Sequence, residues 1–85
     1  MKTINYTIKD NLGIHARPAG ALVKEAGKFK SELTISKGEK TGDLKKIFSL
    51  MGLNIRYNDT VTISANGEDE DIAIGTIENF LKNNL

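Results

Sequence analysis

Polar and apolar residues alternate in three parts of the chain, the pattern of a β-strand with one buried face. These parts are residues 3–9, 31–37 and 60–66, and a turn at residues 37–39 leads into a shorter predicted strand at residues 40–43. We expect one face of these strands to be buried, through Ile4, Tyr6, Ile8, Leu33, Ile35, Val61, Ile63 and Ala65.

Two longer segments have helical periodicity. From Pro18 to about residue 28, apolar residues recur at helical spacing. Asp69 is a predicted N-cap for a last helix, with Glu70 and Asp71 placed to oppose the helix dipole. The buried stripes are expected to be Ala19, Leu22, Val23 and Ala26 in the first helix, and Ile72, Ala73, Ile77, Phe80 and Leu81 in the last.

Residues 44–55 carry apolar side chains on more than one helical face, and Gly52 limits the length of any helix there. This segment is either a tightly wedged core helix or a short helix with an exposed apolar interaction patch. The predicted order is βαββαβα. It is compatible with an α+β two-layer open-faced sandwich, in which a four-stranded antiparallel sheet has all three helices on one face.

Composition limits the choices further. Eighty-five residues make a single domain spanning 1–85, and the absence of cysteine excludes disulfides and thiolate metal sites. A net charge of +1 gives no reason to expect nucleic acid as a partner. No apolar run reaches transmembrane length and the first residues do not resemble a signal peptide, so a cytoplasmic protein is expected.

The only histidine, His15, and the only proline, Pro18, lie where the first strand pattern changes to a helical one, with Arg17 between them. Proline is tolerated in the first turn of a helix, so Pro18 is predicted to mark the helix start. Neither Ile14 nor Ala16 is a side-chain cap, and free N–H groups at an uncapped helix start form an anion site. The stretch therefore suits phosphate.

The residues alone leave two interpretations of His15 open. A neutral imidazole can act as a nucleophile toward a phosphoryl group, with Arg17 and nearby N–H groups holding the phosphoryl oxygens. Alternatively, His15 only packs or caps. A metal site, a hydrolytic triad and a glycine-rich phosphate loop all lack the required residues. The face formed by Gly20, Lys24 and Gly27 is likewise either a flat contact surface or a product of close helix packing, with Gly27 a possible helix terminator.

The sequence 13-GIHARPA-19 resembles the active-site signature of HPr, the histidine-containing phosphocarrier family of the bacterial phosphoenolpyruvate-dependent sugar phosphotransferase system. The resemblance runs the full length and includes 38-GEK-40, 44-LKKI-47 and 61-VTISANGEDE-70.

This resemblance implies a stoichiometric phosphoryl carrier, without a cofactor, rather than an enzyme. His15 would accept phosphate on Nδ1 from phosphorylated enzyme I and donate it to the IIA domains of sugar permeases. Arg17 would stabilise the phosphate, and Pro18 and the N–H groups that follow His15, including that of Ala16, would shape its seat. The implied partner-binding surface consists of Gly20, Lys24, Gly27, Ile47, Phe48 and Met51.

One position departs from the family pattern. Gram-positive members carry a regulatory serine just before Ile47, and here that position is Lys46. Serine phosphorylation is therefore not expected, and Lys46 is a poor N-cap, so the second helix is expected to begin earlier at an Asp43 cap or to fray. The alternative function is a regulatory HPr-like module that controls a transcription factor or an enzyme. A monomer that meets two partners through one face is expected.

Overall fold

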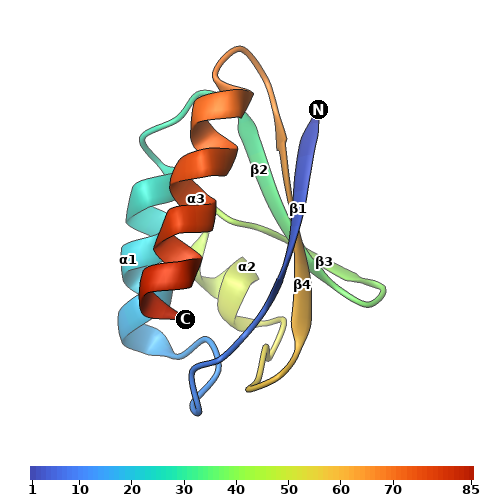
Figure 1. Ribbon diagram of the computed structural model, residues 1–85, viewed down its shortest axis with the longest axis vertical. Coiled ribbons are helices and arrows are strands. Elements are labelled where there is room, and N and C mark those ends of the chain that lie inside the picture. The colour runs from blue at the N-terminus through green and yellow to red at the C-terminus, as the bar shows by residue number, and fades with distance from the viewer.

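The computed structural model describes all 85 residues and confirms the predicted α+β fold and element order. Four antiparallel strands form one sheet in the order β1-β4-β2-β3. The helices lie together on one face of this sheet, and the other face is open (Figure 1). The strands are β1 (Lys2–Thr7), β2 (Glu32–Lys37), β3 (Lys40–Asp43) and β4 (Thr60–Asn66), and the helices are α1 (Ala16–Ala26), α2 (Ile47–Met51) and α3 (Glu70–Asn84).

Strand register places the apolar residues on the helical side of the sheet. Ile63 of β4 lies between Ile4 of β1 and Ile35 of β2, and Ala65 pairs with Leu33. Successive strand residues point to opposite faces, so the residues between them, such as Thr62, face the open side. Val61, Ile63 and Ala65 are fully buried, as the alternation predicts.

Helices α1 and α3 pack on each other and cover the sheet. The predicted stripes are confirmed at Ala19, Leu22, Ala26, Ala73, Ile77 and Leu81, all fully buried. The expectation for Ile72 is wrong, because this side chain is 67% exposed and Ile74 packs against the core instead. Residues 72 and 74 lie about 200° apart around a helix, so only one of them can face the core of a narrow stripe.

Helix α2 starts later than predicted. It begins at Ile47, Lys46 occupies its N-cap position, and neither a side-chain cap nor an acidic residue supports its first turn. Asp43 does not cap this helix, because it lies three residues before the N-cap position, and its Oδ1 accepts a hydrogen bond from the Lys45 N–H, outside the helix, at 2.9 Å. Lys46 therefore brings positive charge to an uncapped helix start.

Asp69 holds the N-cap position of α3 but does not cap the helix with its side chain. Its carboxylate instead accepts hydrogen bonds from the N–H groups of Lys30 and Ser31 and from the hydroxyl of Ser31, a buried residue. These bonds, that of the Ser31 hydroxyl first, lower the pKa of Asp69 to about 2. The carboxylate thus joins the start of α3 to the segment that enters β2.

We predict that Asp69→Asn destabilises the fold at neutral pH. One carboxylate oxygen, which accepts hydrogen bonds from Lys30 or Ser31, is replaced by an NH₂ group, and this group cannot accept them. A lowered folded-state pKa gives stability that is present above about pH 4 and lost as the pH falls toward 2. The difference in unfolding free energy between wild type and variant should therefore shrink below about pH 4 in urea titrations. Asp71→Asn, at an exposed acid in the same first turn, is the control and should show little effect at any pH.

Candidate functional site

The segment that precedes His15 is anchored to the loop between α2 and β4. Ile14 donates its N–H to the Ile55 carbonyl at 3.0 Å, and the Ile14 side chain is buried. Gly13 has a φ of +66°, and a Cβ placed there would lie 2.4 Å from the Ile55 carbonyl oxygen. Only glycine meets both conditions, so the backbone just before His15 is fixed in place.

His15 itself is the N-cap residue of α1. Its backbone is extended, its side chain makes no capping bond, and its carbonyl accepts the first helical bond, from Ala19 N–H at 2.9 Å. The helix starts at Ala16, two residues earlier than the predicted start at Pro18, so Pro18 lies third in the first turn. Proline is tolerated there because an N–H in the first turn has no intrahelical acceptor.

The start of α1 is open to an anion. The N–H groups of Ala16 and Arg17 donate to no acceptor in the chain, and the first turn contains no acidic residue. The exposed Arg17 guanidinium forms no ion pair. Unpaired N–H groups, the positive end of the helix dipole and a free guanidinium together favour a phosphoryl group.

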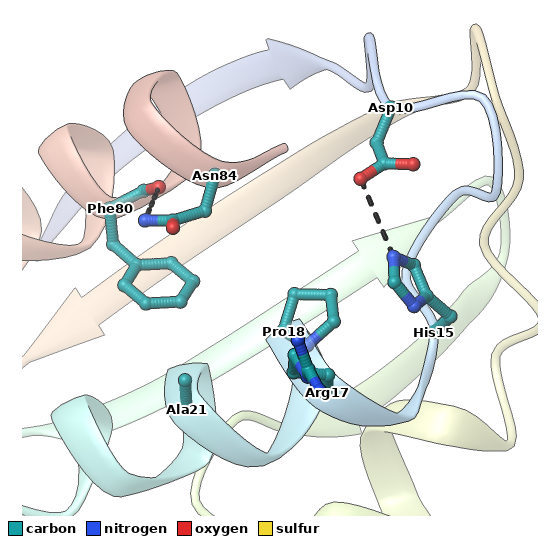
Figure 2. Close-up of a pocket in the computed structure, with 7 residues that line it drawn as sticks. All are labelled: Asp10, His15, Arg17, Pro18, Ala21, Phe80 and Asn84. Atoms are coloured by element: carbon teal, nitrogen blue, oxygen red, sulfur yellow. Dashed lines mark hydrogen bonds and ion pairs between the residues drawn. The ribbon is translucent and has the colours of Figure 1, made fainter.

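A pocket of about 250 Å³ lies beside this helix start. Its lining includes the predicted residues His15, Arg17 and Pro18. Figure 2 shows that Phe80 and Asn84 of α3 form the opposite side. The Asn84 side chain donates to the Phe80 carbonyl at 3.0 Å. Sequence reasoning missed these two residues as part of the site, because only the packing of α3 on α1 brings positions so distant in the chain together.

Asp10 is another residue of the pocket that the sequence did not single out, as is Ala21. Its Oδ2 lies 3.4 Å from His15 Nε2 (Figure 2), and its Oδ1 accepts the Leu12 N–H at 2.9 Å. The Leu12 N–H, and to a smaller extent the His15 side chain, hold the pKa of Asp10 below its usual value. An acidic residue in a turn five positions before a histidine carries no recognisable sequence signal.

The residues predicted to bind partners gather on α1 and α2, which pack against each other. Gly20, Lys24 and Gly27 are exposed, and a Cβ at Gly20 would have no neighbour within 4 Å. Close packing within the chain therefore does not explain these glycines, although Gly27 does follow the last residue of α1. In α2, Phe48 is 88% exposed and Met51 37%, Ile47 is half-buried and only Leu50 is fully buried, so the segment is not a wholly buried core helix.

Comparison with known proteins agrees with this geometry. A family model for the phosphorylation site of the HPr component of the phosphotransferase system matches residues 2–83. The chain belongs to the HPr family. It is 48% identical to the phosphocarrier protein HPr of Mycoplasma genitalium over 85 residues, which cover 99% of this chain and 97% of that protein. The HPr of Mycoplasma pneumoniae is 47% identical over 96% of this chain and 94% of that protein.

Solved structures of HPr proteins share the fold. A histidine-containing phosphocarrier protein from Mycoplasma has a TM-score of 0.94 and 41% identity, over 96% of this chain and 93% of that one. Crh, a Bacillus subtilis catabolite repression protein that forms a swapped dimer, has a TM-score of 0.79 and 31% identity, over 94% of this chain and 92% of that one. As an HPr, the chain is a phosphoryl carrier of the phosphotransferase system, and the regulatory alternative has less support. No helix is long and apolar enough to cross a membrane.

We predict that Gly13→Ala destabilises the protein by more than about 2 kcal/mol, because a positive φ costs about 1 kcal/mol and the new Cβ overlaps the backbone of Ile55 and Arg56. Gly38→Ala is the matched control: Gly38 also has a positive φ, of +60°, but a Cβ there would meet nothing within 4 Å. It should cost only about 1 kcal/mol. If urea denaturation gave the same loss of unfolding free energy for Gly13→Ala and Gly38→Ala, the close contact between Gly13 and the Ile55 backbone would be contradicted.

Proposed function

We propose that His15 is the phosphoryl acceptor of this HPr, taking the group on Nδ1 from phosphorylated enzyme I and giving it to IIA domains. One observation carries this proposal: His15 holds the N-cap position of α1 without capping the helix through its side chain. It therefore lies next to the N–H groups of Ala16 and Arg17, which have no acceptor in the chain. The His15 side chain is also about one-third exposed, so a partner can reach the ring.

In the transfer, the Nδ1 lone pair forms a bond to phosphorus while the bond between phosphorus and the donor breaks, and that electron pair leaves with the donor. The N–H groups of Ala16 and Arg17 and the Arg17 guanidinium then bind the phosphoryl oxygens, where charge is spread in the transition state. Pro18 contributes shape, since its ring is buried and offers no N–H. The reverse step regenerates His15, so each protein molecule carries one phosphoryl group at a time.

We propose the α1–α2 surface as the docking site for enzyme I and IIA domains. It consists of Gly20, Lys24, Gly27, Ile47, Phe48 and Met51. An exposed apolar centre with a basic neighbour, Lys24, suits a transient complex, because charge accelerates encounter and the small apolar contact stays weak. A monomer in the cytoplasm, without nucleic acid, membrane insertion, cofactor or metal, fits this role. With Lys46 in place of the regulatory serine, we expect no phosphorylation at that position.

His15→Ala should abolish uptake of the one acid-labile, base-stable phosphate that phosphoenolpyruvate and enzyme I add to the wild type. Mass spectrometry of the intact protein measures the added mass. Arg17→Lys keeps the charge but loses the planar donor pair, so uptake should slow by about tenfold or more. If His15→Ala still takes up this label, His15 is not the acceptor.

Phe48→Ala should weaken docking of enzyme I, raising the KM for this HPr by about five- to tenfold, with little change in kcat or in unfolding free energy. Stability should hold because the side chain is 88% exposed. Ile72→Ala is the control, since Ile72 is also a large, exposed apolar residue but lies on α3. An unchanged KM in Phe48→Ala, or an equal rise in Ile72→Ala, would contradict the docking surface.

A further inference from the structure

Asp10 is held in place by almost all of its polar groups. Its N–H donates to the Leu85 carbonyl at 2.9 Å, and its carbonyl accepts the Gly13 N–H at 2.9 Å. Its Oδ1 accepts the Leu12 N–H at 2.9 Å. One oxygen, Oδ2, has no partner among these turn contacts.

That remaining oxygen faces the His15 ring. Asp10 Oδ2 lies 3.4 Å from His15 Nε2, and both side chains are about one-third exposed (Figure 2). A carboxylate oxygen can only accept, so this contact favours the proton of the neutral ring on Nε2. The lone pair of the neutral ring is then on Nδ1, the nitrogen that does not face Asp10.

We infer that Asp10 is a positioning residue for phosphoryl transfer, because it selects the Nε2–H tautomer of His15 and thereby leaves Nδ1 as the nucleophile. This inference rests on the proposed role of His15. It deepens that role by naming what decides which nitrogen reacts, since the partner of one imidazole nitrogen sets the state of the other.

The same contact serves both directions of transfer. When Nδ1 bonds to phosphorus, the ring keeps its Nε2 proton and gains positive charge, which the Asp10 carboxylate stabilises. When the Nδ1–phosphorus bond breaks toward the next acceptor, its electron pair returns to Nδ1 and the ring leaves as neutral imidazole. No proton has to be supplied or removed in either step.

Two charged groups share the pocket with the ring, Asp10 and Arg17. Arg17 has only donors, so it cannot hold an Nε2 proton. Asn84 is a neutral lining residue with an amide oxygen that can accept, but it lies across the pocket from the ring, and the one side-chain hydrogen bond of Nε2 is to Asp10 (Figure 2). Asp10 is therefore the acceptor that the structure places against Nε2.

Asp10→Asn tests the inference sharply. The one carbonyl oxygen of asparagine can keep the Leu12 turn, and its NH₂ group then faces Nε2 as a donor. This favours the opposite tautomer, with the proton on Nδ1. Asp10→Ala removes both contacts, and Asp71→Asn, a matched loss of charge at an exposed acid on α3, is the control.

Two measurements are needed for each variant. Long-range ¹H–¹⁵N spectra of the His15 ring report the tautomer of the unphosphorylated protein, and rapid-quench assays with enzyme I and phosphoenolpyruvate give kcat and KM for uptake. In the wild type we expect the Nε2–H tautomer to dominate. In Asp10→Asn we expect its fraction to fall and kcat to drop about tenfold, with KM changed by less than about twofold.

The outcomes separate the hypotheses. A purely structural role predicts that Asp10→Asn, which keeps the turn, behaves like the wild type while Asp10→Ala is impaired. The positioning role predicts that Asp10→Asn is at least as slow as Asp10→Ala and that Asp71→Asn is normal. If Asp10→Asn keeps the wild-type tautomer and kcat, the inference about Asp10 is wrong but the role of His15 is unaffected. If His15→Ala still takes up phosphate from enzyme I, the proposed role of His15 as the acceptor is wrong.

Discussion

The approach of Gly13 to the Ile55 carbonyl is the contact on which the site depends. It sets the backbone just before His15, and so determines where α1 begins and where its unpaired N–H groups point. The same anchoring fixes the Asp10 turn, because Gly13 also donates its N–H to the Asp10 carbonyl. A loop far away in the chain, between α2 and β4, thus positions the reactive end of the first helix.

The fold was largely predictable from local pattern. Strand alternation located β4 to the residue, and the stripe of α1 was right at Ala19, Leu22 and Ala26, because burial of one face imposes its period on the sequence. The two errors in helix capping have a common source in competing hydrogen-bond donors. Asp43 and Asp69 were expected to cap helices, but other backbone N–H groups lie within their reach, and a sequence does not show which donor a carboxylate will bind.

The site was predictable in part. His15, Arg17 and Pro18 are adjacent in the chain, so the sequence alone brings them together. Asp10 and Phe80 reach the pocket through a turn and through helix packing, which depend on tertiary structure. Close packing at Gly20 could be excluded only once the structure showed empty space next to this residue.

The exposed side chain of Phe48 also has a consequence for timing. If donor and acceptor use one face of the carrier, each must leave before the other can bind. Complexes with dissociation constants near 1–10 μM and association rates of about 10⁷ M⁻¹s⁻¹ last for about 10 to 100 milliseconds. A small apolar patch in which Phe48 is largely exposed, while Met51 is 37% exposed and Ile47 half-buried, matches such short residence times. A broader apolar face would hold each partner longer and slow the relay.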